Sequence, residues 1–80
     1  MLQLELNAKR YIQLGLKIAY YRKLRSLTQE QLAEKIDMSV GFLSQVEAPN
    51  MVTPISMDTL FLIADTLEVE PHRFLVFEDI

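Results

Sequence analysis

The chain has 80 residues, of which half are hydrophobic, with no cysteine, one histidine and a net charge of −3. Without cysteine there is neither a disulfide nor a thiolate metal site, and one histidine is too few for a transition-metal cluster. No segment approaches the roughly 18 consecutive apolar residues of a membrane span, and residues 1–6 lack the features of a signal peptide. We expect one cytoplasmic domain over residues 1–80, with a core at 14–75 between an N-terminal extension (1–13) and a tail (76–80), and with no cofactor, metal or membrane partner.

The charge is unevenly distributed along the chain. Residues 1–48 contain seven Lys or Arg against five Asp or Glu, whereas residues 49–80 contain one Arg against six acidic residues. Contact with DNA phosphates requires a local cationic face rather than a basic protein. The distribution is therefore compatible with DNA binding through the N-terminal half.

A first helix is predicted from about Ala8 to Arg25, with Asn7 as a plausible cap. Its apolar face contains residues at i, i+4, i+7 spacing: Leu14, Ile18 and Tyr21. Gly15 weakens the prediction of an unbroken helix, because glycine costs about 1 kcal/mol relative to alanine.

Both ends of the chain leave a β alternative open. Residues 2–6 alternate with period two, as in a half-buried strand, and residues 74–77 could form an apolar strand or the end of a helix. A small β pairing of the termini, within or between chains, is the alternative to an all-α fold.

Two short helices are predicted around a tight turn in the middle of the chain. Thr28 and Gln31 have the spacing of a capping box, and Ser39 is a good cap for a helix that ends near Glu47, before a proline. Two short helices joined by a tight turn indicate a helix-turn-helix, in which the second helix enters the DNA major groove.

The rest of the chain predicts a loop and two further helices. The loop spans 48–55, Ser56 caps a fourth helix, and the pair Glu70-Pro71 marks the start of a fifth. The fourth helix has its own apolar stripe: Leu60, Ile63, Ala64 and Leu67.

The helix after Ser39 divides into two faces at about 100° per residue. Leu43 and Val46 point to one side, and the opposite side contains the candidate base contacts Val40, Gly41, Ser44 and Gln45. A glutamine amide can pair bidentately with adenine, and Val40 could pack on a thymine methyl. Taken singly, each of these residues is also ordinary for an exposed helix.

The candidate phosphate contacts are polar and cationic residues of the N-terminal half. Gln29 lies at the start of the second helix, where free N–H groups favour anions. A solvated side chain is the alternative for Gln29 and the commoner case for each cation. The candidates are Gln29, Ser39, Lys17, Lys23 and Arg25, with Lys9, Arg10 and Lys35 as further cations.

About three quarters of the chain, from Leu14 to Phe74, resembles the lambda-repressor-like DNA-binding domains of the Cro and xenobiotic-response-element type. The resemblance rests on three motifs: Ile18-x-x-x-Arg22-x-x-x-x-Leu27-Thr-Gln-x-Gln-Leu-Ala33, Ser39-x-x-x-Leu43-Ser-x-Val-Glu47 and Asp58-Thr-Leu-x-x-Ile-Ala64-x-x-Leu67. It implies a compact all-α domain of five helices that acts as a dimeric transcriptional regulator on a near-palindromic operator. It also implies a structural ion pair between Arg22 and Glu47, and a phosphate contact at Gln29.

The chain departs from this family in two places. Relatives usually follow the glutamate with a basic residue and a glycine, whereas the segment 48–55 here is about two residues longer and contains no cation. The outward residues of the third helix also include no Arg or Lys, which makes the commonest guanine contact unavailable. We expect an operator rich in A·T pairs, read partly through DNA shape.

The apolar C-terminal end suggests a dimer interface on a small domain. The candidates are Phe74, Val76, Phe77 and Ile80, each of which could instead complete the core of the monomer. The chain is thus interpreted as a DNA-binding regulator and not an enzyme, because no nucleophile–base pair or phosphate-cradling glycine loop is present. The alternative is a protein-interaction module, for example of the antitoxin type, that has the same fold and binds DNA weakly or not at all.

Overall fold

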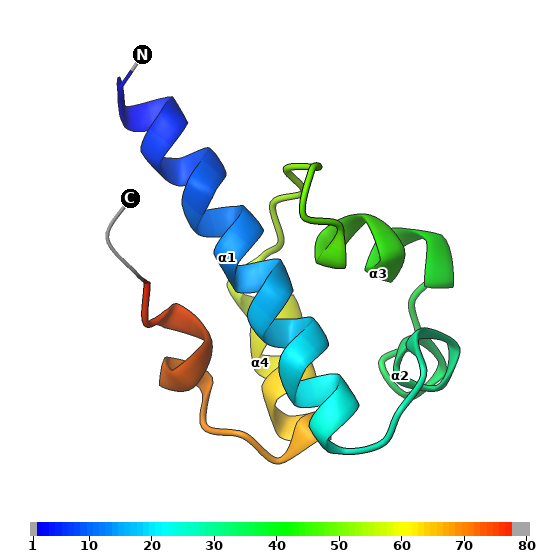
Figure 1. Ribbon diagram of the computed structural model, residues 1–80. Coiled ribbons are helices and arrows are strands. Elements are labelled where there is room, and N and C mark those ends of the chain that lie inside the picture. Colours follow the sequence, from blue (N-terminus) through cyan, green and yellow to red (C-terminus); the bar gives the residue numbers. More distant parts are fainter. Residues whose placement is uncertain (1, 78–80) are drawn as a thin grey trace.

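The computed structural model describes residues 2–77, with side chains from residue 5 onward. Its elements are the α-helices α1 (Leu2–Leu24), α2 (Gln29–Lys35), α3 (Val40–Glu47) and α4 (Met57–Leu67), followed by the 3₁₀ helix η1 (Pro71–Leu75) (Figure 1). No strand occurs within residues 2–77. The all-α prediction is confirmed, but the fifth helix is a single 3₁₀ segment, so the described chain contains four α-helices.

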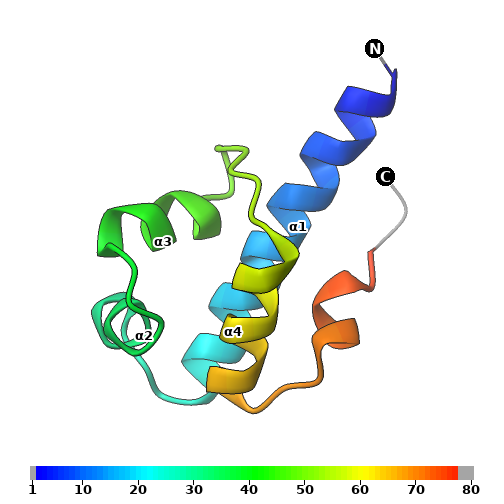
Figure 2. The ribbon, with the colours of Figure 1, turned by 180° about the vertical axis from the view of Figure 1, so that it is seen from behind.

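Helix α1 begins earlier than predicted. It starts at Leu2 instead of Ala8, so the β alternative for residues 2–6 is wrong and Asn7 lies inside the helix rather than capping it. Strong helix formers such as Leu, Gln, Glu, Lys and Arg dominate this segment, and it contains no proline. The N-terminal part of α1 extends past the rest of the domain (Figures 1 and 2).

The predicted helix starts at Thr28, Ser39 and Ser56 are confirmed. In the capping box of α2, Gln31 N donates to Thr28 Oγ1 at 3.1 Å and Thr28 N donates to Gln31 Oε1 at 2.8 Å. Ser39 Oγ accepts from Phe42 N at 3.0 Å, and Ser56 Oγ accepts from Thr59 N at 3.1 Å. Each cap satisfies a backbone donor that the helix itself leaves free.

Three helices end with a non-glycine residue in the left-handed conformation. Ser26, Asp37 and Glu68 have φ values of 60°, 55° and 57°. At each end the following residue donates its N–H back to a carbonyl five residues earlier, as in the Schellman motif: Leu27 to Arg22, Met38 to Ala33 and Val69 to Ala64. The motif at Asp37 forms the tight turn between α2 and α3.

One hydrophobic core joins all five elements. Its fully buried side chains come from every helix and from η1: Ile18, Leu32, Leu43, Leu60, Ile63, Leu67 and Phe74. Tyr21 packs edge-on against Phe74, with ring centroids 5.2 Å apart. This contact holds η1 against α1, so the C-terminal end of the domain is tied to its first helix.

Gly15 marks a close contact between α1 and the end of α3. A Cβ atom added to Gly15 would overlap the carbonyl oxygen of Val46 and lie 2.9 Å from its carbonyl carbon. The absence of a side chain therefore lets the two backbones meet. The glycine that weakened the helix prediction is needed for packing, and α1 is continuous through it.

Candidate nucleic-acid interface

Helix α3 presents two different faces, as its sequence predicts. Leu43, Val46 and Glu47 are buried against the body of the domain. The four candidate base contacts are all exposed: Val40, Gly41, Ser44 and Gln45. Val40 is 44% exposed, and the space around Gly41 is open to a distance of 4 Å. The outer face is thus accessible to a large ligand along the length of the helix.

A buried ion pair anchors the inner face of α3. Arg22 Nε donates to Glu47 Oε2 and Arg22 Nη2 donates to Glu47 Oε1, both at 2.8 Å. The two residues are only 7% and 6% exposed. Such a two-point contact between planar groups sets both distance and orientation, so the pair predicted from the family resemblance links α1 directly to α3.

Further hydrogen bonds complete the network around Glu47. The third guanidinium nitrogen, Arg22 Nη1, donates to the carbonyl oxygen of Leu27 at 2.7 Å. Gln29 Nε2 donates to Glu47 Oε1 at 2.9 Å. The bond to Glu47 is the main cause that raises the pKa of Arg22, and burial opposes it. Through these bonds, α1, α2 and α3 share one polar centre.

The sequence did not reveal this contact of Gln29. Its amide was predicted to be solvated or bound to phosphate, and in the structure it is half-buried and bonded to Glu47. A partial signal was available, since Gln29 belongs to the same motif as Arg22, whose partner Glu47 the family resemblance names. Sequence spacing alone does not show that a residue at a helix start reaches the end of the next helix.

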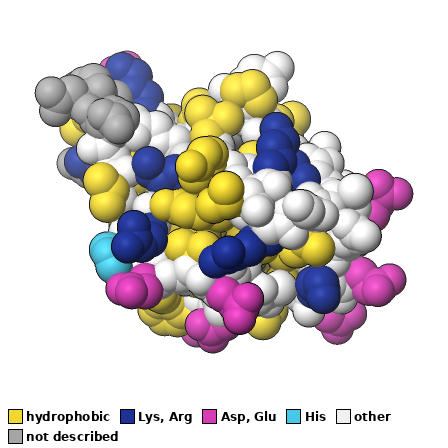
Figure 3. All heavy atoms as spheres, turned by 60° about the horizontal axis from the view of Figure 1, so that its bottom comes forward, with side chains coloured by type: hydrophobic (Ala, Val, Ile, Leu, Met, Phe, Trp, Pro, Cys, Tyr) yellow, Lys and Arg dark blue, Asp and Glu magenta, His cyan; other side chains and the backbone are white. Residues whose placement is uncertain are grey.

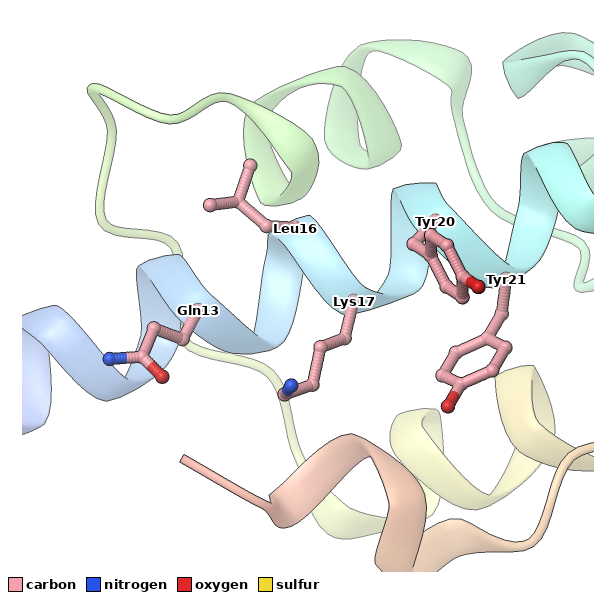
Figure 4. A pocket seen from close by; sticks show the side chains of 5 residues that line it. All are labelled: Gln13, Leu16, Lys17, Tyr20 and Tyr21. Carbon is pink, nitrogen blue, oxygen red and sulfur yellow. The ribbon is translucent and has the colours of Figure 1, made fainter. Parts of the chain in front are cut away.

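The candidate cations lie in three different places. Lys23 lines an open groove together with Gln29, Ser44 and Glu47, beside the outer face of α3. Lys17 lines another groove on α1, with Gln13, Leu16, Tyr20 and Tyr21 (Figure 4). The structure therefore brings Lys23, but not Lys17, to the α3 surface.

Arg25 is engaged elsewhere in the fold. Its Nε donates to the carbonyl oxygen of Leu67 at 2.7 Å and its Nη2 donates to that of Glu68 at 3.0 Å. A cation at the C-terminal end of a helix is favourable because the last carbonyls there have no helical partner. Arg25 thus caps α4, which the prediction of a phosphate contact missed.

The C-terminal candidates for a dimer interface also separate. Phe74 is completely buried in the core of its own chain, so its inclusion in an interface is a correction to the prediction. Val76 is exposed and Phe77 is half-buried, while Ile80 lies outside the described residues. Helix α4 has three more exposed apolar residues, which the sequence did not indicate as interface candidates: Met57, Phe61 and Leu62.

The described residues offer no metal centre. Within residues 2–77 no three His, Cys, Asp or Glu side chains are grouped so that they could hold a metal ion. None of the helices in this part of the chain is both long enough and apolar enough to cross a membrane.

Comparison with known proteins agrees with this geometry. The chain is similar to the crystal structure of SinR, the master regulator for biofilm formation, in complex with DNA, with a TM-score of 0.72 and 32% sequence identity. The similarity covers 79% of this chain and 98% of the SinR chain. A search of curated proteins gave no match. Residues 18–74 match the helix-turn-helix family, and the chain therefore belongs to this family, in its lambda-repressor-like branch.

Proposed function

We propose that this protein is a dimeric repressor that reads a near-palindromic operator by placing α3 in the major groove. The observation that carries the proposal is the division of α3 into an anchored inner face and an open outer face. A recognition helix needs both, because its angle must be fixed while its base-reading side chains stay free. Family membership and the similarity to SinR, which was solved in complex with DNA, support DNA binding and transcription regulation rather than catalysis.

The outer face favours particular base contacts. Gln45 is exposed and can pair bidentately with adenine, and Val40 can contact a thymine methyl group. A Cβ atom added to Gly41 would meet no atom of another part of the chain within 4 Å, so the DNA can approach the backbone closely there. Since α3 contains no Lys or Arg, we propose an operator with A·T pairs under this helix.

Phosphate contacts are proposed where polar groups border the outer face. Lys23 lines the groove beside Ser44, and Gln29 lies at the start of α2 with one amide hydrogen committed to Glu47. Ser39 lies at the start of α3 and is exposed. Lys17 and Arg25 are left out, since one lines a different groove and the other caps α4.

The proposed dimer uses the apolar C-terminal end. Phe77 and Leu75 line an apolar groove with Tyr11, Ile55 and Met57, and Val76 is exposed next to it. Two-fold pairing of such a surface would place the two α3 helices one DNA turn apart, about 34 Å. Both Phe77 and Val76 would then be buried between the two copies.

A fluorescence-anisotropy titration tests the proposal. The protein is titrated against the duplex upstream of its own gene and against a scrambled duplex, at two salt concentrations, with Gln45→Ala in parallel. We expect tighter binding to the native duplex, weakened by salt and by the substitution, which costs about 1–3 kcal/mol for a bidentate base contact. Equal binding to both duplexes would place the operator elsewhere.

The second candidate function is a protein-interaction module with this fold. It is favoured by the acidic balance of residues 49–80 and by the loop at 48–55, which has no cation. Absence of binding to either duplex at low salt would overturn the repressor proposal and support this one.

A further inference from the structure

The outward face of α1 is apolar and cationic. Leu16, Tyr20 and Leu24 follow one another at four-residue spacing, and they are 44%, 60% and 58% exposed. The groove that Lys17 lines runs along this face, with Leu16 and Tyr20 at its sides (Figure 4). The sequence contains no Asp or Glu between Glu5 and Glu30. Lys17 is the charged residue among those that line this groove, whereas Leu24 borders a separate groove that also contains Glu68 and Glu70.

The outward face of α4 has the opposite character. Phe61 and Leu62 are 44% and 41% exposed, on the side opposite to the buried residues Leu60, Ile63, Ala64 and Leu67. Asp58 and Asp65 are exposed on the same side, and α4 contains no Lys, Arg or His. Here an apolar surface of similar exposure is accompanied, within α4, by negative charges only.

These two faces lie on opposite sides of the domain. Helix α1 crosses in front of α4 in Figure 1, and α4 lies in front of α1 in the reverse view of Figure 2. Figure 3 shows a band of hydrophobic side chains in the middle of one side, with Lys and Arg beside it and most Asp and Glu toward the edges. Complementary surfaces on opposite sides of one chain can join copies in series.

We propose that the outward face of α4 of one copy docks on the outward groove of α1 of a second copy. The apolar residues Phe61 and Leu62 would cover Leu16 and Tyr20, and the aspartates of α4 would lie near Lys17 and its neighbours. The contact is head-to-tail, so each added copy leaves one face free for a further copy unless the series closes into a ring. It uses neither α3 nor the C-terminal residues Val76 and Phe77, and it does not depend on DNA binding.

Charge explains the choice of this pairing over a symmetric one. Pairing two α1 faces would bring cations against cations, and pairing two α4 faces would bring Asp58 and Asp65 against the same residues of the other copy. Like charges across an interface disfavour it, whereas complementary charges select the partner and the register. Only the unlike faces match in both charge and apolar surface.

Sedimentation velocity of the full chain, without DNA, tests the contact through two complementary variants. Tyr20→Glu places a negative charge on the α1 face, and Phe61→Lys places a positive charge on the α4 face; both positions are exposed, and circular dichroism verifies the fold. For the wild type at low salt, we expect a sedimentation coefficient that rises with concentration. Each variant alone is expected to associate about tenfold more weakly or worse. An equimolar mixture is expected to sediment faster than either variant alone, because each retains the face that the other has lost.

The outcomes separate this contact from the alternatives. Val40→Glu is the matched control, since Val40 is as exposed as Phe61 but lies on α3; it should leave self-association unchanged and abolish DNA binding. A wild-type sedimentation coefficient independent of concentration, or a mixture that sediments no faster than its components, would overturn the proposal. Because no DNA is present, a loss of DNA binding would leave this result unaffected. Both variants retain the proposed C-terminal dimer surface, so faster sedimentation of the mixture than of either variant identifies the contact between α1 and α4.

Discussion

The two faces of α3 differ in their contacts with the rest of the domain. On the inner face, Leu43 is completely buried and Glu47 is bonded to both Arg22 and Gln29. On the outer face, Val40 and Gly41 have no such contacts, and the space around Gly41 is open. Within this helix of eight residues, the inner face is expected to serve the stability of the fold and the outer face the binding of DNA. Changes on the inner face are expected to lower the free energy of unfolding, whereas changes on the outer face are expected to act mainly on DNA affinity.

The largest effect is expected from breaking the buried ion pair. Glu47→Leu leaves the Arg22 guanidinium buried without its partner, which costs about 3–5 kcal/mol. For a domain of this size, each kcal/mol lowers the melting temperature by roughly 4–8 °C. Thermal and urea unfolding followed by circular dichroism measure the loss.

The double variant Arg22→Met/Glu47→Leu is the control for this prediction. Replacing both members of a buried pair with apolar residues is often close to neutral, so most of the lost stability is expected to return. The double variant also removes the hydrogen bond that Arg22 Nη1 donates to the carbonyl oxygen of Leu27. If the double variant were no more stable than Glu47→Leu alone, an unpaired charge would not be the cause.

The next effect concerns the glycine that lets α1 reach α3. Gly15→Ala would place a methyl group on the Val46 carbonyl, where backbone rather than a flexible side chain must move. We expect a loss of about 1–3 kcal/mol, as for overpacked cores, even though alanine is the better helix former. Urea unfolding measures it, and a variant as stable as the wild type would show that α1 and α3 can separate without cost.

Local signals in the sequence predicted much of this fold. The caps at Thr28, Ser39 and Ser56 were found because a hydroxyl three residues before a helical N–H is a short-range pattern. The core stripes of α1 and α4 follow from helical periodicity, since Leu14, Ile18, Leu60 and Ile63 are all buried. The Arg22–Glu47 pair came from the family resemblance, and both residues of the pair are buried as it implied.

The errors concern contacts between segments far apart in the sequence. Arg25 reaches the carbonyls of Leu67 and Glu68, and Gln29 reaches Glu47, neither of which is visible in a local pattern. Helix propensity predicts that Gly15 weakens α1, because propensity describes an isolated helix and not its contact with α3. Helix α1 starts before the predicted Ala8, because the helix formers of residues 2–6 outweigh their short alternation of polar and apolar residues.

A smaller effect is expected at Ser39, where the two faces of α3 begin. Ser39→Ala removes the acceptor for Phe42 N and is expected to cost about 1 kcal/mol in the free energy of unfolding. Ser56→Ala, which removes the equivalent cap of α4, is the matched control because it lies away from the proposed DNA surface. If Ser39 also contacts phosphate, only Ser39→Ala will weaken DNA binding beyond its effect on stability; equal DNA affinities for the two variants would assign Ser39 to capping alone.

The smallest effect on stability, and the sharpest separation of the two faces, is expected at Gly41. An added Cβ meets nothing within 4 Å, so Gly41→Ala is expected to raise the stability of α3 by up to about 1 kcal/mol through helix propensity. The same methyl group would lie between the α3 backbone and the DNA, and fluorescence anisotropy is expected to show weaker binding to the native duplex. Gly15→Ala gives the opposite result for stability, although both substitutions add one methyl group to a helical glycine. Unchanged DNA affinity in Gly41→Ala would mean that the N-terminal turn of α3 does not approach the bases closely, and recognition would then rest on Ser44 and Gln45.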